Sequence, residues 1–179
     1  ETTYSANVMK YDASADIWEK IGEPVSLKHA PKYITISVNS NEVPYIAFSS
    51  CSFESCERIN EDNLHYTIDT TSVMKFDGDD WVYVGEPMFN YDPEKDIESS
   101  GNQIIFDSAD TPYGSFLAEM NLSLLKFNSS EWLIINNTEY SKESPVYLLP
   151  FVDSENNFYY IIDGEFFKFD GKEMTALEV

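Results

Sequence analysis

Short apolar runs alternate with short polar stretches rich in Asn, Asp and Ser along this chain. Three times, two apolar runs enclose such a polar stretch, which is the sequence signal of a β-hairpin. No segment has a convincing apolar period of 3.6 residues, so we expect almost no helix. The three predicted hairpins lie in residues 33–48, 102–116 and 146–162.

One phrase recurs four times, each time at the end of an apolar run: two apolar residues, Lys, an aromatic residue, then Asp or Asn. A tryptophan follows three of the copies, and Met174 stands in that place after the fourth. A tight turn after the phrase would join a third strand to a fourth, which gives the make-up of one propeller blade. A repeat of roughly 40 to 65 residues is typical of a propeller or a similar array. The copies are residues 8–12, 73–77, 124–128 and 166–170, and the tryptophans are Trp18, Trp81 and Trp132.

The pattern predicts an all-β propeller of four-stranded antiparallel blades, with about three and a half blades in this chain. We expect one partial propeller domain over residues 1–179, with a half blade at 5–22 and blades at 33–85, 102–136 and 146–179. A ring closed by this chain alone would leave a sheet edge exposed. We therefore expect the remaining blades to come from further sequence or from another chain. A self-contained ring of four blades, one of them incomplete, is the alternative.

The phrase resembles the kelch-type repeat, in which a Tyr-Asp pair is followed a few residues later by Trp, as in Tyr11, Asp12 and Trp18. Residues 77–81 also resemble the Asp-box turn of sialidase-like propellers. The diglycine of true kelch repeats is absent from every copy. The resemblance implies that the Trp packs between sheets and the Asp caps the turn. We interpret these residues as structural parts of the blades.

The formal net charge of −21 comes from 32 acidic and 11 basic residues. Nucleic acid and anionic membrane surfaces both attract Lys and Arg, so neither is an expected partner. No apolar stretch approaches the roughly 18 residues that a membrane-spanning helix needs, so we expect no membrane insertion. The excess of acidic residues favours solubility, and the more specific alternative interpretation is that carboxylates bind Ca²⁺.

Cys51 and Cys56 stand in a polar loop, and the chain contains two histidines. Four residues separate the two cysteines, whereas a thioredoxin-type site has two between them. Further soft ligands for a metal are few. We expect a local disulfide, which would place the protein in an oxidising compartment. Glycosylation sequons at Asn121, Asn128 and Asn136 weakly support a secreted or cell-surface location.

In blade topology the long connections emerge on one face, here residues 22–32, 49–70, 86–101 and 137–145, and such loops usually carry function. Within 86–101, acidic residues alternate beside two aromatic residues. Aromatic rings stack on the apolar face of a sugar, and carboxylates accept hydrogen bonds from its hydroxyls. A solvated acidic loop and a Ca²⁺ site are the alternatives. The candidate ligand-binding residues are Phe89, Tyr91, Asp92, Glu94 and Asp96.

Catalysis finds less support in the sequence. A sialidase-like clamp needs several arginines, and the chain has only Arg58. A copper oxidase of the kelch type would need His29 and His65 to converge, and no Gly-X-Ser-X-Gly motif is present. We therefore expect a non-catalytic extracellular recognition module for a glycan or protein, without a cofactor. A carboxylate-dependent glycosidase or lyase, and a structural subunit of an extracellular assembly, remain the alternatives.

Overall fold

The computed structural model describes residues 4–27, 31–50, 70–90, 99–118, 121–139, 150–162 and 165–178. Within these ranges every regular element is a β-strand. No helix of the described part is long and apolar enough to cross a membrane. The expectation of an all-β protein with four-stranded antiparallel sheets is thus confirmed.

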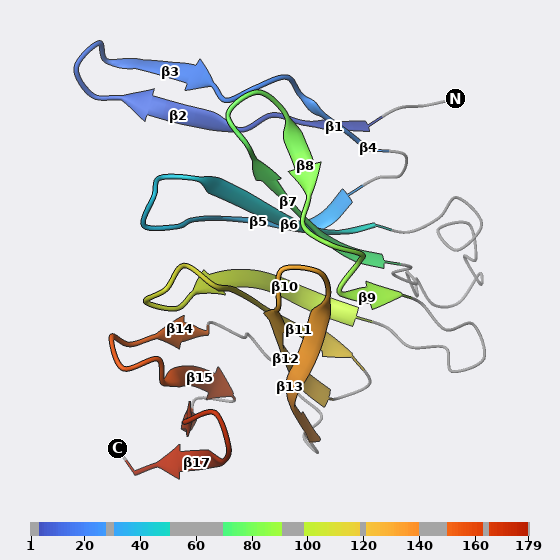
Figure 1. Ribbon diagram of the computed structural model, residues 1–179, viewed down its shortest axis with the longest axis vertical. Coiled ribbons are helices and arrows are strands. Elements are labelled where there is room, and N and C mark those ends of the chain that lie inside the picture. The colour runs from blue at the N-terminus through green and yellow to red at the C-terminus, as the bar shows by residue number, and fades with distance from the viewer. Residues whose placement is uncertain are drawn as a thin grey trace, which may run out of the picture.

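The first unit is a two-stranded hairpin in which each strand is interrupted once (Figure 1). β1 pairs with β4 and β2 with β3, and between these pairs the Ile21 N–H donates to the Val8 carbonyl at 2.9 Å. We call this unit the first hairpin. Its strands are β1 (Tyr4–Ala6), β2 (Met9–Asp12), β3 (Ile17–Lys20) and β4 (Val25–Leu27).

Three larger sheets follow, each with its strands in chain order. In the second sheet β8 and β9 both pair with β7, so they act as one interrupted outer strand. The second sheet holds β5 (Pro31–Val38), β6 (Pro44–Ser50), β7 (Thr70–Phe76), β8 (Trp81–Tyr83) and β9 (Phe89–Asn90). The third sheet holds β10 (Ser99–Phe106), β11 (Pro112–Ala118), β12 (Asn121–Phe127) and β13 (Trp132–Glu139). The fourth sheet holds β14 (Phe151–Val152), β15 (Phe158–Ile162), β16 (Glu165–Phe169) and β17 (Met174–Leu177).

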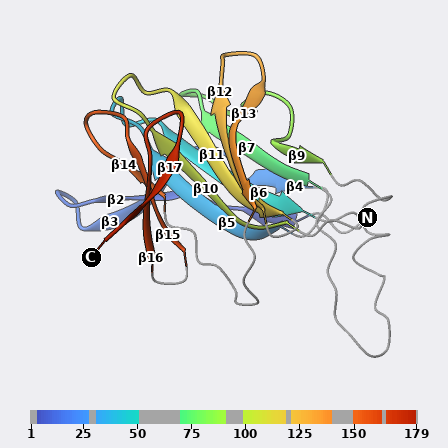
Figure 2. The same cartoon turned by 90° about the horizontal axis from the view of Figure 1, so that it is seen from below.

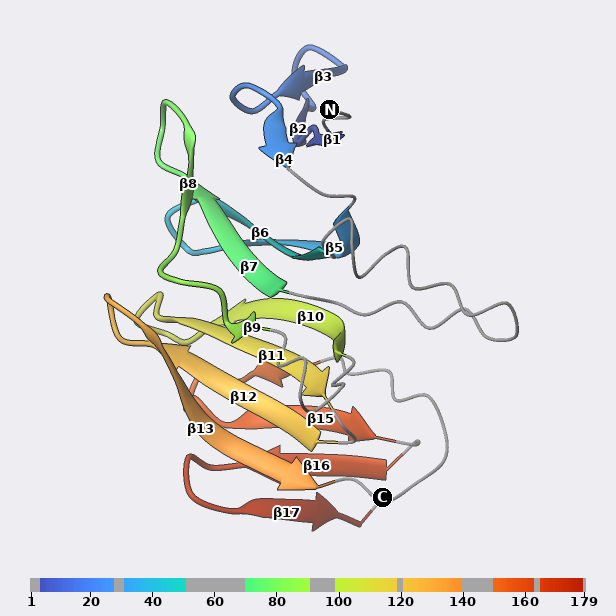
Figure 3. The ribbon, with the colours of Figure 1, turned by 90° about the vertical axis from the view of Figure 1, so that its right-hand side faces the viewer.

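The four units follow one another along the long axis, from the first hairpin to β17 (Figure 3). Strand directions change from unit to unit, as the view along the stack shows (Figure 2). A separate apolar cluster fills each of the three interfaces between successive units. The first strands of the three sheets, β5, β10 and β14, contact each other in that order. The core is therefore divided into three layers between sheets.

The Asp or Asn of the recurring phrase caps the turn that follows each third strand. Asp77 Oδ1 accepts hydrogen bonds from the backbone N–H groups two and three residues ahead, at 3.0 and 2.9 Å. A side chain that accepts these N–H groups stabilises the turn from within. The equivalent residues Asp12, Asn128 and Asp170 make the same contacts. Their predicted role as turn caps is confirmed.

Candidate functional site

The strand registers divide the molecule into two ends. At one end, tight turns such as the one between Val38 and Pro44 join neighbouring strands, and we call it the turn end. At the other end Ser50 pairs with both Pro31 and Thr70, and we call it the connection end (Figure 3). The segments 28–30, 51–69, 91–98 and 140–149 join strands that begin or finish at the connection end.

Equivalent connections differ greatly in length at the connection end. Residues 119–120 join β11 to β12 and residues 163–164 join β15 to β16, whereas residues 51–69 join the equivalent strands β6 and β7. A short link is therefore sufficient for this sheet geometry. Segment 51–69 is therefore much longer than this sheet geometry requires.

The two acidic connections, residues 51–69 and 91–98, are flanked by two residues that pair with each other. Thr70, which follows segment 51–69, pairs with Asn90, which precedes segment 91–98. Phe89, a predicted ligand residue, lies in β9 beside β7 and pairs with Thr71. The structure therefore anchors both predicted loop regions at one place on the connection end. The predicted residues Tyr91, Asp92, Glu94, Asp96, Cys51 and Cys56 lie outside the described residues.

The three predicted glycosylation residues are spread over the third sheet. Asn121 begins β12 at the connection end, where it pairs with Glu139. Asn128 lies in the turn at the opposite end, where its Oδ1 accepts three hydrogen bonds. Asn136 lies in β13 and pairs with Leu124.

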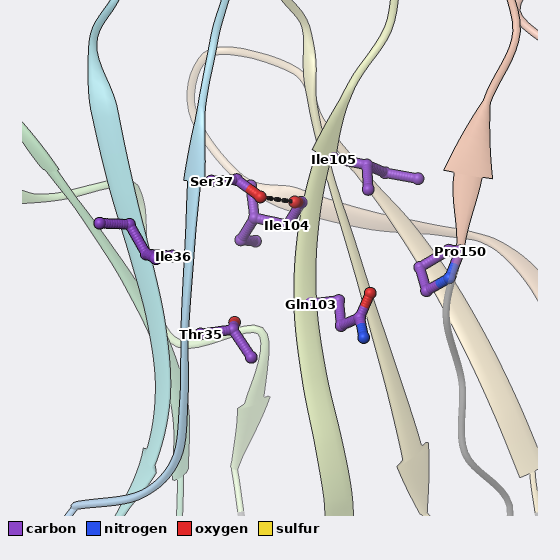
Figure 4. A pocket seen from close by; sticks show the side chains of 7 residues that line it. All are labelled: Thr35, Ile36, Ser37, Gln103, Ile104, Ile105 and Pro150. Carbon is purple, nitrogen blue, oxygen red and sulfur yellow. Dashed lines mark hydrogen bonds between the residues drawn. The ribbon is translucent and has the colours of Figure 1, made fainter.

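A shallow hollow of about 430 Å³ lies between the first strands of the second and third sheets (Figure 4). Thr35 and Ser37 face β10, and the Ser37 hydroxyl donates a hydrogen bond to the Ile104 carbonyl. Its lining contains no ionisable side chain, so it offers contact surface but neither a general acid nor a general base. The lining residues are Thr35, Ile36, Ser37, Gln103, Ile104, Ile105 and Pro150.

A buried polar cluster lies between the second and third sheets at Ser49, Thr71 and Asn102, all 0 % exposed. The Asn102 amide donates to Ser49 Oγ, and its carbonyl oxygen accepts from Thr71 Oγ1 at 3.4 Å. The two hydroxyl oxygens are 3.1 Å apart. Hydroxyls without a neighbouring base are not activated nucleophiles. We assign the cluster to holding the sheets together, a role that the sequence pattern did not predict.

The repeat tryptophans reach from one sheet to the preceding unit. Trp81 Nε1 donates to the Ile21 carbonyl at 3.1 Å, and Trp132 Nε1 donates to the Val84 carbonyl at 2.8 Å. The predicted packing between sheets is confirmed for Trp81 and Trp132, whereas Trp18 is 66 % exposed. A second repeat follows the two acceptor carbonyls and was missed in the sequence: Gly-Glu-Pro at residues 22–24 and again at 85–87.

Hydrogen bonds stabilise the ionised form of the turn carboxylates. For Asp153, donation from the Asn157 side chain and backbone, and then from Tyr159 and the Glu155 N–H, lowers the pKa to about 2. For Asp110, hydrogen bonds from Ser40 lower the pKa. Within the described ranges no group of three or more His, Cys, Asp or Glu residues could hold a metal ion. These carboxylates are therefore committed to turns.

Asp153→Asn is expected to reduce the loss of unfolding free energy that the wild-type protein shows as the pH falls into the acid range. The pKa of Asp153 is lower in the folded state than the ordinary 3.8, so its contribution is complete above that value and is lost as the pH falls toward about 2. Asparagine keeps a side-chain oxygen that can accept hydrogen bonds from the backbone N–H groups of the turn, as Asn39 does in the equivalent turn of the second sheet. Urea unfolding at a series of pH values measures the change. Glu155→Gln in the same turn is the control, and a variant curve parallel to that of the wild type would contradict the assignment.

Comparisons with known proteins leave the function open. No protein-family model matches the chain, and no curated protein sequence matches it. Function therefore has to be inferred from the arrangement of the sheets and from what their two ends carry.

Proposed function

We propose that this chain forms about three and a half blades of a kelch-like or Asp-box-like β-propeller. It acts outside the cell as a non-catalytic recognition module and binds a glycan or a protein at the connection end. The pairing of Thr70 with Asn90, which anchors both acidic connections at one place, carries this proposal.

The propeller assignment is supported by hydrogen bonds between equivalent turns. Asp110 in the third sheet accepts hydrogen bonds from the Ser40 N–H at 2.9 Å and the Ser40 hydroxyl at 2.6 Å. In the same way, Asn156 in the fourth sheet accepts one from the Ser108 N–H at 2.9 Å. The first turns of the third and fourth sheets are thus each tied to the first turn of the preceding sheet. Such regular contacts between successive four-stranded meanders are what radial repetition requires.

The recognition role is supported by the composition of the anchored segments. Segments 51–69 and 91–98 contain nine acidic residues, two basic residues and three aromatic residues besides Phe89. Carboxylates accept hydrogen bonds from hydroxyl and amine groups, and aromatic rings stack on sugars or pack against protein side chains. Ligand-binding residues are commonly carried on loops held by a rigid scaffold.

A structural subunit of an extracellular assembly is the second candidate, because the outward face of the first hairpin is apolar. Met9, Tyr11 and Trp18 have exposed fractions of 40, 44 and 66 %. In contrast, Met74, at the position equivalent to Met9, is only 7 % exposed, because the first hairpin packs on that side of the second sheet. A neighbouring sheet would cover the hairpin in the same way.

The recognition proposal predicts that shortening one connection abolishes binding and leaves the sheets intact. Residues 51–69 are replaced by Glu-Met, the pair that joins β11 to β12 at residues 119–120. Wild-type protein on a glycan array is expected to give saturable binding that the replacement lowers by at least about tenfold. Circular dichroism should show an unchanged strand content. Repeating the array with a chelator tests whether Ca²⁺ takes part.

Asp79→Asn, which removes a negative charge at the turn end, is the control and should leave binding unchanged. Array binding that survives replacement of 51–69 and also survives a combined D92N, E94Q and D96N variant would refute the connection end as the site. Complete absence of glycan binding would remove the glycan arm of the proposal and leave the protein arm.

A further inference from the structure

The second and third sheets are each joined to the preceding unit by a contact with two halves. As described above, Trp81 and Trp132 donate to carbonyls of the preceding outer strand, and Gly-Glu-Pro follows each acceptor. An added Cβ at Gly22 or Gly85 would lie 2.6 or 2.7 Å from an aromatic ring of the next sheet. The indole and the Gly-Glu-Pro therefore belong together, and we call the two the tryptophan contact.

Both halves of the tryptophan contact are replaced at the boundary between the third and fourth sheets. Met174 pairs with the last aromatic residue of its phrase, as Trp132 does in the third sheet. The residue equivalent to Val84 is Ile135, three positions after Trp132, and Asn-Asn-Thr follows it in place of Gly-Glu-Pro. The outer strand β13 continues through Ile135 with a register shift at that point, whereas the outer strand of the second sheet is interrupted. Within the described ranges, this boundary is therefore held without the tryptophan contact.

The first turns differ in the same sense. Asp110 of the third sheet accepts three hydrogen bonds from the first turn of the second sheet: two from Ser40 and one from the Asn41 amide. Among the described residues, Asn156 of the fourth sheet accepts one hydrogen bond from the corresponding turn, from the Ser108 N–H. Hydrogen bonds to an ionised carboxylate are stronger than those to a neutral amide. The fourth sheet is therefore tied more weakly at the turn end.

Polar side chains are paired at one boundary and unpaired at the other. The buried polar cluster between the second and third sheets is joined by its own hydrogen bonds. Tyr160 belongs to the apolar cluster between the third and fourth sheets, and Ser115 shares a face of β11 with Tyr113 of that cluster. Both hydroxyls are buried, and neither has a hydrogen-bond partner in the part of the chain that the structure describes. Burial without a partner costs free energy that is recovered when the hydroxyl reaches water, so both groups favour opening of this boundary.

From these three differences we propose that the stack opens reversibly at the boundary between the third and fourth sheets under native conditions. The fourth sheet moves as one unit, while the second and third sheets stay joined. Parts of a protein that are held by weaker contacts open with a lower free energy than global unfolding requires. Both boundaries lie between sheets of this chain, so the difference does not depend on what precedes or follows it. Opening at this boundary is separate from ligand recognition at the connection end.

Two consecutive leucines of β12 report on the two boundaries separately. Leu124 packs between the third and fourth sheets and Leu125 between the second and third, and they are 0 % and 1 % exposed. Leu124→Cys and Leu125→Cys are made separately in the full chain, with Cys51→Ser and Cys56→Ser, and treated with a thiol reagent in the absence of denaturant. Labelling of Leu124→Cys is expected to be at least about tenfold faster, because opening exposes this position alone. Urea unfolding of both variants corrects for a difference in global stability, and equal or reversed rates after that correction would overturn the proposal.

Tyr160→Phe tests the cause of the opening. In the Leu124→Cys protein it should slow labelling by at least about fivefold, because it removes a hydroxyl that only the opened form can hydrate. Tyr159→Phe is the matched control: the Tyr159 hydroxyl already donates to Asp153 at 2.9 Å, so its removal should not slow labelling. Equal slowing by both substitutions, or faster labelling after Tyr160→Phe, would overturn the proposal, because the Tyr160 hydroxyl would then not favour the opened form.

Hydrogen exchange distinguishes opening of the whole fourth sheet from fraying of its last strand. The amides of β15 and β16 are expected to exchange through one common opening, with a smaller urea dependence than the amides of β11 and β12. Exchange that instead slows strand by strand from β17 to β15 would be fraying and would contradict movement of the sheet as a unit. A single opening shared by all four strands β11, β12, β15 and β16 would show that the boundary does not open on its own.

Discussion

Trp132→Ala is expected to lower the free energy of unfolding by about 3 to 4 kcal/mol. The indole packs at the interface between the second and third sheets, and the centroids of the Trp132 and Phe127 rings are 5.1 Å apart. Its Nε1 donates to the Val84 carbonyl at 2.8 Å. The substitution therefore opens a cavity and also leaves a carbonyl without its donor. Urea unfolding followed by circular dichroism measures the loss.

Trp18→Ala is the matched control, because Trp18 occupies the same place in the repeat but is 66 % exposed. Its loss of stability should stay below about 1 kcal/mol. Trp132→Phe keeps most of the ring and removes the donor, so it should fall between the two variants. Equal losses for Trp18→Ala and Trp132→Ala would show that contact with the preceding unit is not what the repeat tryptophan contributes.

Within each sheet, the strand order could be predicted because the sequence repeats its own register. The aromatic residue after each first turn pairs with the lysine of the phrase: Tyr45 with Lys75, Tyr113 with Lys126 and Tyr159 with Lys168. Asx residues mark both kinds of tight turn in every sheet, since their side chains accept backbone N–H groups locally. These are short-range relations, and alternation of apolar and polar residues is enough to reveal them.

Contacts between sheets were not predictable from such local patterns. Asn102 hydrogen-bonds to Ser49 and Thr71, two polar residues in neighbouring strands of another sheet, and periodicity gives no sign of that partnership. The expected connection at residues 22–32 also begins later than predicted. Val25 and Leu27 form β4 and are 3 and 5 % exposed, because they pack against the second sheet. A two-residue apolar alternation after Pro24 was too short to predict a strand.

The candidate site could be predicted only in part. Its place at the end opposite the tight turns follows from blade topology, and the registers bring segments 51–69 and 91–98 to adjacent anchors at Thr70 and Asn90. That adjacency depends on β9 pairing with β7 beyond the end of β8, an interruption with no clear signal except the Gly-Glu-Pro at residues 85–87. The exposure of Ile36, 55 % against 2 % for the equivalent Ile104, likewise becomes visible only in the folded chain.

Gly85→Ala is expected to lower the free energy of unfolding by about 2 to 4 kcal/mol, from backbone strain and overpacking together. Gly85 has a φ of +71°, which side chains other than glycine rarely adopt, and an added Cβ would lie 2.7 Å from the Phe127 ring. Val84 directly precedes Gly85. The backbone conformation at Gly85 must therefore also keep the Val84 carbonyl in place to accept the hydrogen bond from Trp132 Nε1. Thermal and urea unfolding of the variant measure the loss.

Two further variants separate strain from crowding at Gly85. Gly171 has a φ of +92° with nothing within 4 Å of an added Cβ, so Gly171→Ala should cost only the backbone term of about 1 kcal/mol. Phe127→Leu in the Gly85→Ala background should recover part of the stability, because a smaller side chain gives the new methyl group room. If Gly85→Ala costs no more than Gly171→Ala, the close approach of the ring is not what requires glycine, and the interface between the sheets depends on the tryptophan alone.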